Sequence, residues 1–211
     1  MRTLRNVIIK QINPEGRGAV YEIFNRLNTT GVNLTAQEIR ISLADSPMME
    51  KIVEINSSDE WRRLFGVPGA DPRLRDIEII LRAFAMADEA TSYKPSMVRF
   101  LDRYADRTRT FTAPEVQARI AAFCSFLEEV GNLDRSPFLI SNRFSVPVFE
   151  AVYAAYFQGI SAGKEPRLNN PSLEQLSADQ EFMGAASTHT TDTKNVTTRI
   201  DRAKHYLFEA K

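Results

Sequence analysis

Apolar residues recur every three or four positions over most of this chain, which is the spacing of an amphipathic helix. The most regular stretch is residues 73–88, which we predict to be the central helix. Its apolar face consists of Ile77, Ile80, Leu81, Phe84 and Ala85. Because these positions keep the helical period over the whole stretch, we expect this face to pack into the core.

The same spacing predicts a series of further helices along the chain. They cover residues 21–27, 35–43, 47–55, 57–65, 112–130, 146–160, 172–185 and 195–209, with another that begins at Pro95. In the helix after Pro95 we expect Val98 to face inward, and in residues 112–130 we expect Cys124 to be buried. Residues 136–141 are predicted to be a loop.

Three of these helices begin with the sequence pattern of a capping box, in which a Ser or Thr is followed three positions later by Glu. The pairs are Thr35 with Glu38, Ser57 with Glu60, and Thr112 with Glu115. In each pair the hydroxyl accepts from the backbone of the Glu, and the carboxylate accepts from the backbone of the capping residue. These pairs therefore predict where the three helices begin.

Residues 6–12, which begin at Asn6 and end at Ile12, form the only convincing strand in the sequence. A single strand leaves its backbone groups unpaired, so we expect it to pair outside this chain or to mediate self-association. The alternative is an irregular terminal arm. The predicted fold is mainly α: a multi-helix bundle, residues 14–211, preceded by one short strand in residues 1–13.

Composition excludes few classes of protein. Lys and Arg total 27, as do Asp and Glu, so nucleic-acid binding would have to depend on a local patch. A single cysteine excludes an intramolecular disulfide. No apolar run approaches the roughly 20 residues of a membrane span, so we expect no membrane partner and a cytoplasmic protein.

The common catalytic motifs are missing from the sequence, which has no Walker loop, no His-Glu-x-x-His and no Gly-x-Ser-x-Gly. The two histidines are sixteen positions apart, so we predict neither a metal site nor catalytic residues. Asp76 and Glu78 do not face each other on a helix, which argues against a Mg²⁺ pair. An ion pair between Glu78 and Arg82 is the better prediction.

One basic stripe is a candidate for contact with DNA phosphates. Arg99, Arg103 and Arg107 recur every four residues and therefore share a helix face. The alternative is a solvated face of mixed charge, because Asp102 and Asp106 lie three positions from Arg99 and Arg103. The sequence leaves both readings open.

A longer motif carries a resemblance to a known family. The chain is similar to the N-terminal domain family of GmrSD restriction endonucleases, a ParB-like family of modification-dependent restriction and phage-defence systems. The motif is Phe24-x-Arg26-Leu27-Asn28-x-x-Gly31-x-x-Leu34-x-x-x-Glu38-x-Arg40. Matching pieces follow in order: Arg75-Asp76-x-Glu78, Leu81-Arg82-x-Phe84, Phe100-Leu101, Phe144, Phe149 and Val196-x-x-Arg199-Ile200.

The resemblance implies a function for the intact system more than for this chain. Family members carry a ParB-like front half whose Asp-Gly-Gln-Gln-Arg motif is linked to nucleotide hydrolysis. That motif is absent here, so the chain resembles the helical back half, and residues 1–13 would complete a ParB-like sheet supplied by a front half or partner subunit. NTP and Mg²⁺ would then belong to the intact domain, which couples hydrolysis to recognition or cleavage of modified foreign DNA. We expect no independent catalysis from this chain.

Two interpretations of the motif's polar residues remain open. In the functional one, Arg26, Asn28 and Arg40 bind nucleotide or phosphate, because Arg offers a fork of donors and Asn both donates and accepts. In the structural one, Arg26 pairs with Glu22, and Asn28 and Glu38 close and cap their helices. The apolar positions and Gly31 are structural in either case. A rival class is a non-enzymatic helical interaction or regulatory module that completes a partner subunit.

Overall fold

The computed structural model describes residues 23, 34–134 and 136–209, and these residues form ten α-helices, α2 to α11. The predicted strand of residues 6–12 lies outside the described residues. So does the first part of the motif, from Phe24 to Gly31, including Arg26 and Asn28. The second part of the motif, with Leu34, Glu38 and Arg40, leads into α2.

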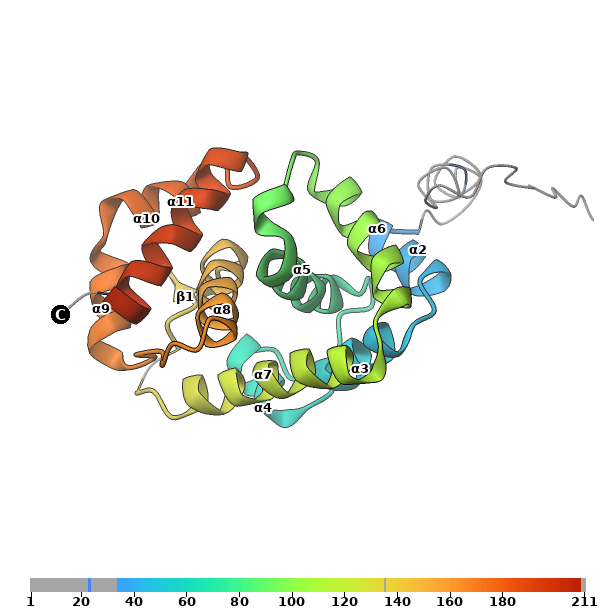
Figure 1. Ribbon diagram of the computed structural model, residues 1–211, viewed down its shortest axis with the longest axis horizontal. Coiled ribbons are helices and arrows are strands. Elements are labelled where there is room, and N and C mark those ends of the chain that lie inside the picture. Colours follow the sequence, from blue (N-terminus) through green and yellow to red (C-terminus); the bar gives the residue numbers. More distant parts are fainter. Residues whose placement is uncertain (1–22, 24–33, 135, 210–211) are drawn as a thin grey trace, which may run out of the picture.

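Two helices, α5 (Arg75–Glu89) and α8 (Val146–Ser161), lie side by side at the centre (Figure 1). On the α8 side are α10 (Gln180–Ser187) and α11 (Thr193–Lys204), and α11 packs directly on α8. On the α5 side are α2 (Ala36–Leu43) and α6 (Met97–Arg107). Below them runs the long helix α7 (Ala113–Gly131), which contacts α3 (Pro47–Asn56) and α4 (Asp59–Phe65).

The helix starts follow the predicted caps in two of three cases. The capping boxes of Thr35 with Glu38 and of Thr112 with Glu115 are both present. The third prediction is wrong by one residue, since α4 is capped by Ser58, whose hydroxyl accepts from the Trp61 amide. Ser57 instead ends α3 in a right-handed helical conformation, which is incompatible with an N-cap.

Two predictions of burial are wrong. Val98 is 44% exposed, because α6 turns Met97, Phe100, Leu101 and Tyr104 inward and Val98 falls beside that face. Cys124 is exposed on α7, whose inner face is formed by its neighbours Phe123 and Leu127 among others. Two short 3₁₀ turns, η1 (Ala90–Ser92) and η2 (Thr108–Thr110), flank α6.

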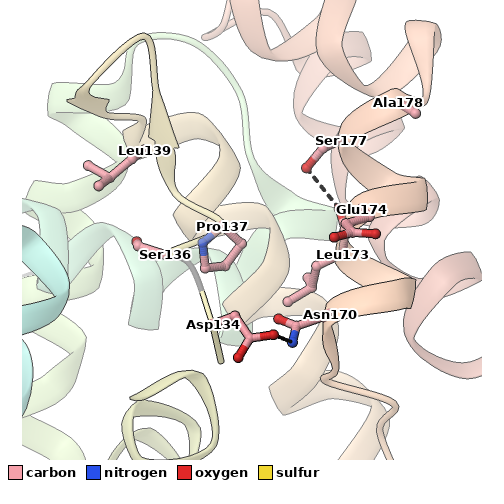
Figure 2. A pocket seen from close by; sticks show the side chains of 9 residues that line it. All are labelled: Asp134, Ser136, Pro137, Leu139, Asn170, Leu173, Glu174, Ser177 and Ala178. Carbon is pink, nitrogen blue, oxygen red and sulfur yellow. Dashed lines mark hydrogen bonds between the residues drawn. The ribbon is translucent and has the colours of Figure 1, made fainter. Parts of the chain in front are cut away.

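The segment predicted to be a loop, residues 136–141, includes the first strand of a small hairpin, which extends three residues beyond it. β1 (Leu139–Ile140) pairs antiparallel with β2 (Arg143–Phe144), and positive φ values at Ser141 and Asn142 are those of a tight hairpin turn. The predicted helix 172–185 is likewise two helices, α9 (Asn170–Ala178) and α10. Asp179 is extended between them and caps α10 through the Phe182 amide. The hairpin and α9 form the walls of a pocket (Figure 2).

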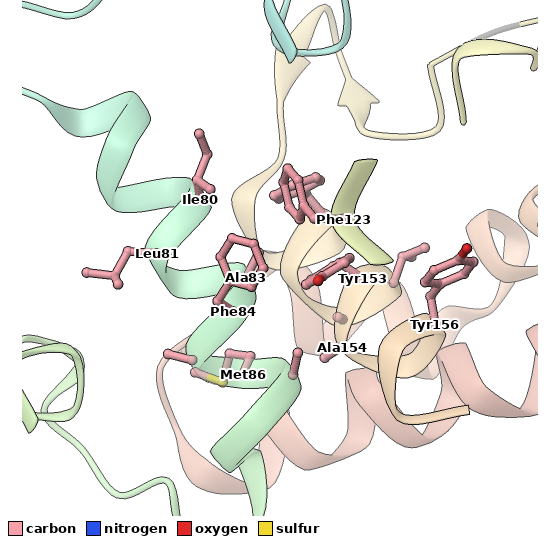
Figure 3. Packing of buried hydrophobic residues seen from close by; sticks show 14 of the residues in the cluster. Ile80, Leu81, Ala83, Phe84, Met86, Phe123, Tyr153, Ala154 and Tyr156 are labelled. Carbon is pink, nitrogen blue, oxygen red and sulfur yellow. The ribbon is translucent and has the colours of Figure 1, made fainter. Parts of the chain in front are cut away.

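Aromatic side chains fill the space between α5, α7 and α8 (Figure 3). Phe84 is 1% exposed, and its ring centroid lies 4.9 Å from that of Phe123, which lies 4.8 Å from Tyr153. The prediction that residues 73–88 form the central helix is thereby confirmed. Small residues on α8, such as Ala154, let it approach its neighbours closely.

The last helix continues into a π-helical turn, η3 (His205–Glu209), which packs back on α8. At this contact the Phe208 ring lies over Gly159, where a Cβ atom would come within 2.0 Å of it.

The expected fold class, mainly α with several packed helices, is confirmed for the described residues. Within the same residues, no helix combines the length and the apolarity needed to cross a membrane.

Candidate functional site

The motif residue Arg40 lies inside the protein, where α2, α5 and α6 meet. Its side chain is 0% exposed, and Nε donates to Asp102 Oδ1 at 2.8 Å while Nη1 donates to Glu78 Oε2 at 2.8 Å. Nη1 also donates to the Gln37 side chain, and Nη2 donates to the Val98 carbonyl at 3.3 Å. Four of the five guanidinium N–H groups are therefore used within the protein. This arrangement favours a structural role for Arg40 over phosphate binding.

Glu38 and Leu34 lie at the start of the same helix. The Glu38 carboxylate accepts from the Thr35 amide, and the Thr35 hydroxyl accepts from the Glu38 amide. Hydrogen bonding with Thr35 lowers the pKa of Glu38. It also lies 3.6 Å from the guanidinium of Arg73. Leu34 is 38% exposed. Glu38 thus occupies the structural position that the capping-box pattern predicts.

A second arginine–carboxylate cluster lies between α5, α8 and α11. Glu150 is 1% exposed and accepts from Arg82 Nε and Arg199 Nη2, both at 2.8 Å. Arg199 is also 1% exposed and donates to the Ala185 and Thr190 carbonyls at 2.9 Å. The predicted pair of Glu78 with Arg82 is therefore wrong, because Glu78 pairs with Arg40 and Arg82 with Glu150. Each carboxylate neutralises an arginine on another helix.

A third polar cluster is centred on the buried carboxylate of Asp76, at the first turn of α5. It accepts from the Asn56 amide at 3.0 Å and from Arg62 at 2.8 Å, and Asn56 in turn accepts from the Trp61 indole. Burial alone would raise the pKa of Asp76, but hydrogen bonds from the Asp71 amide, Arg62 and Asn56 together lower it. The ionised carboxylate of Asp76 therefore links α5 to α3 and α4.

The outer face of α6 carries three basic side chains on one line. Arg99, Arg103 and Arg107 are all exposed, and Arg107 pairs with Glu89 of α5. The carboxylates expected to neutralise the other two are engaged elsewhere. Asp102 points inward to Arg40, and Asp106 lies 3.4 Å from Arg109. Neither Arg99 nor Arg103 forms an ion pair with another described residue.

The inward position of Asp102 changes its acidity. Burial raises the pKa of its carboxyl, and the nearby Glu78 acts in the same direction, whereas Arg40 opposes the shift. Arg103 also lowers this pKa through its charge, so Asp102 still offsets part of that charge from inside, although the two residues form no ion pair. The face of α6 therefore carries two arginines, Arg99 and Arg103, without an ion-pair partner among the described residues.

The structure brings only part of the predicted site together. Arg40 lies beneath α6, and Arg99 and Arg103 lie on its outer surface, while Arg26 and Asn28 fall outside the described residues.

The sequence analysis did not identify Glu150 as a site residue, although a lone carboxylate within the apolar run of residues 146–157 is a signal for a buried ion pair. In the part of the chain that the structure describes, no three or more His, Cys, Asp or Glu side chains are grouped as metal ligands.

Comparison of the chain with protein-family models, curated proteins and solved structures finds no significant match. The resemblance to the GmrSD family therefore stays a prediction from the motif residues.

Proposed function

We propose that this chain is the helical module of a GmrSD-type restriction system and that the outer face of α6 contacts the phosphates of DNA. The observation that carries the proposal is the inward position of Asp102, which leaves Arg99 and Arg103 exposed without an ion-pair partner among the described residues. In such a system a ParB-like front half, with NTP and Mg²⁺, would supply hydrolysis, and this chain would position the DNA.

The contacts among the motif residues support the resemblance behind this proposal. Arg40 and Glu78 come from two separate pieces of the resemblance, and they form an ion pair across 38 positions. Arg82 and Arg199 come from two further pieces and share Glu150. Polar residues that match a family pattern far apart in sequence thus meet in the interior, as expected if the pattern describes one folded unit.

The geometry of α6 suits a phosphate backbone. Residues four apart on a helix are separated by about 6 Å along its axis, so Arg99 and Arg103 lie on one line within reach of neighbouring phosphates. Each phosphate contact releases condensed counterions, which makes binding depend on salt with a slope of about 0.9 per contact on a logarithmic plot. Two arginines predict a weak, sequence-independent contribution.

Binding of a labelled DNA duplex, measured by fluorescence anisotropy over a salt series, tests the proposal. The double variant Arg99→Gln/Arg103→Gln should weaken binding. It should also reduce the slope of the logarithm of the binding constant against the logarithm of the salt concentration by the contribution of about two phosphate contacts. Arg63→Gln is the matched control, because that side chain is 77% exposed on α4, away from this face. Equal salt slopes for the wild type and the double variant, or no binding by the wild type, would refute DNA contact through α6.

A further inference from the structure

The line of arginines on α6 leads to an aromatic ring at the end of the helix. Arg99, Arg103 and Arg107 recur every four residues along α6. Phe111 follows at the same interval, beyond η2 and just before the start of α7 (Figure 1). The side chain of Arg107 is 50% exposed, and Phe111 is only partly buried. The basic face of α6 therefore continues to a ring that reaches the surface.

Two guanidinium groups lie over the ring of Phe111. The guanidinium carbon of Arg119 is 4.4 Å from the ring centroid, and that of Arg107 is 5.6 Å from it. Both distances are those of a cation–π contact. Each arginine is also fixed by a carboxylate of α5, since Arg119 pairs with Asp88 at 2.8 Å and Arg107 pairs with Glu89. The ion pairs thus hold both planar groups in place over the ring.

The position of Phe111 in the fold explains only part of this arrangement. The residue precedes Thr112, the N-cap of α7, and its ring meets that of Tyr104 edge-on, with 6.2 Å between the centroids. An apolar residue just before an N-cap packs against its surroundings and fixes the start of the helix, which accounts for the partial burial. Helix capping requires neither guanidinium, and Arg107 keeps half of its side-chain surface in solvent.

We propose that Phe111 and Arg107 form a stacking platform for an unpaired base, and that the nucleic acid bound along α6 is single-stranded DNA. The inference rests on the proposed contact of Arg99 and Arg103 with phosphates. Unpaired bases stack on aromatic rings and on the planes of arginine guanidinium groups, whereas the bases inside a duplex are stacked on one another. The row of arginines would follow the phosphates of one strand, and a base of that strand would stack at the end of the row.

Charge alone would favour the opposite choice. A duplex has a higher density of phosphates than a single strand and releases more counterions for each phosphate contact. A protein that contacts only phosphates therefore binds the duplex more tightly. Tighter binding of the single strand requires contacts with the bases, and Phe111 with Arg107 supplies such a contact beside the row.

Fluorescence anisotropy with the full chain tests the platform on three labelled oligonucleotides of equal length. They are a thymidine strand, its duplex with the complementary strand, and a strand in which abasic residues replace the thymidines. We expect the thymidine strand to bind most tightly. The abasic strand keeps the phosphates but has no bases to stack, so it should bind at least about fivefold more weakly.

Two variants separate stacking from charge. Phe111→Leu keeps an apolar residue but removes the aromatic face, and Arg107→Lys keeps the charge but removes the planar group. Each should lower the ratio of single-strand to duplex affinity by about fivefold or more. This ratio is insensitive to partial unfolding, because a smaller folded fraction weakens both complexes alike. Phe157→Leu is the matched control, because Phe157 is a partly buried aromatic residue of α8, on the opposite side of α5 from α6 (Figure 1). The ratio for that variant should equal that of the wild type.

Two results would overturn the stacking platform and leave the proposed function standing. The first is a wild type that binds the duplex as tightly as the thymidine strand, or more tightly. The second is a ratio of affinities that neither Phe111→Leu nor Arg107→Lys changes. A wild type that binds none of the three oligonucleotides would overturn the platform and the proposed DNA contact together.

Discussion

Replacing Glu150 by Gln removes the carboxylate that neutralises the buried Arg199 and the partly buried Arg82. The side chains of Glu150 and Arg199 are each 1% exposed and that of Arg82 is 16% exposed, with N–O distances of 2.8 Å in both pairs. A pair of unit charges about 4 Å apart interacts by about 4 kcal/mol at an effective dielectric constant near 20. The two pairs together supply about 8 kcal/mol of attraction, from which the repulsion between Arg82 and Arg199 and the cost of burying the carboxylate must be subtracted.

The net effect of Glu150→Gln should be a loss of about 3–5 kcal/mol in the free energy of unfolding, the range for breaking a buried ion pair. Glutamine keeps one carbonyl acceptor but leaves the positive charges of Arg82 and Arg199 uncompensated. Urea unfolding followed by circular dichroism measures the loss, with an unchanged dependence on denaturant concentration as the sign that the folded state is the same. Glu54→Gln, at an exposed carboxylate, should lose less than about 0.5 kcal/mol.

The double variant Glu150→Gln/Arg82→Gln sharpens the test. Because removing Arg82 also removes one of the two unpaired charges, the double variant should be less destabilised than the sum of the two single variants. A loss below about 1 kcal/mol for Glu150→Gln, or strictly additive losses, would mean that the three side chains do not form the buried cluster described above.

Three further predictions concern other parts of the described structure. Phe84→Ala should cost about 3–5 kcal/mol in chemical denaturation, because the ring is buried among Phe123 and Tyr153, and a loss below about 1 kcal/mol would contradict that packing. The exposed Cys124 should react stoichiometrically with a maleimide in the folded protein. The reaction should be slower than that of a free thiol, because partial burial and the charge of Glu128 raise the pKa of Cys124. No labelling before denaturation would contradict the exposure of this side chain. The pKa of Asp76 is lowered on folding, so its contribution to stability is present above its unfolded pKa of about 3.9 and is lost as the pH falls through the folded value. The stability difference between the wild type and Asp76→Asn should therefore shrink below about pH 4, and a difference that is constant down to acid unfolding would contradict it.

The helices were predictable where one local rule decides the structure. The regular apolar face of α5 and the capping pairs at Thr35 and Thr112 need only neighbouring residues, and the structure has all three. The break at Asp179 was missed because the apolar period runs on across it, while its side chain caps the next helix and its carboxylate accepts from Arg202.

The ion pairs were not predictable from spacing alone. Spacing favoured Arg82 as the partner of Glu78, because the two are one helical turn apart. The observed partner, Arg40, lies 38 positions away, because its fully buried guanidinium is neutralised by carboxylates of two other helices, Glu78 on α5 and Asp102 on α6. The same reason explains why Asp102 turned inward and why the arginines on α6 were left exposed. Long-range neutralisation of this kind becomes visible only when the helices are placed in space.

The contacts of Arg40 have a mechanical consequence. One guanidinium joins the side chain of Gln37 on its own helix to Glu78 on α5 and to both a side chain and a backbone carbonyl of α6. A shift of α2 by more than a hydrogen-bond length would leave Arg40 or its carboxylates unpaired in the interior, which is strongly destabilising. Arg40 therefore fixes the position of α2 against α5 and α6 together, and the start of α2 cannot move without disturbing the helix that carries Arg99 and Arg103.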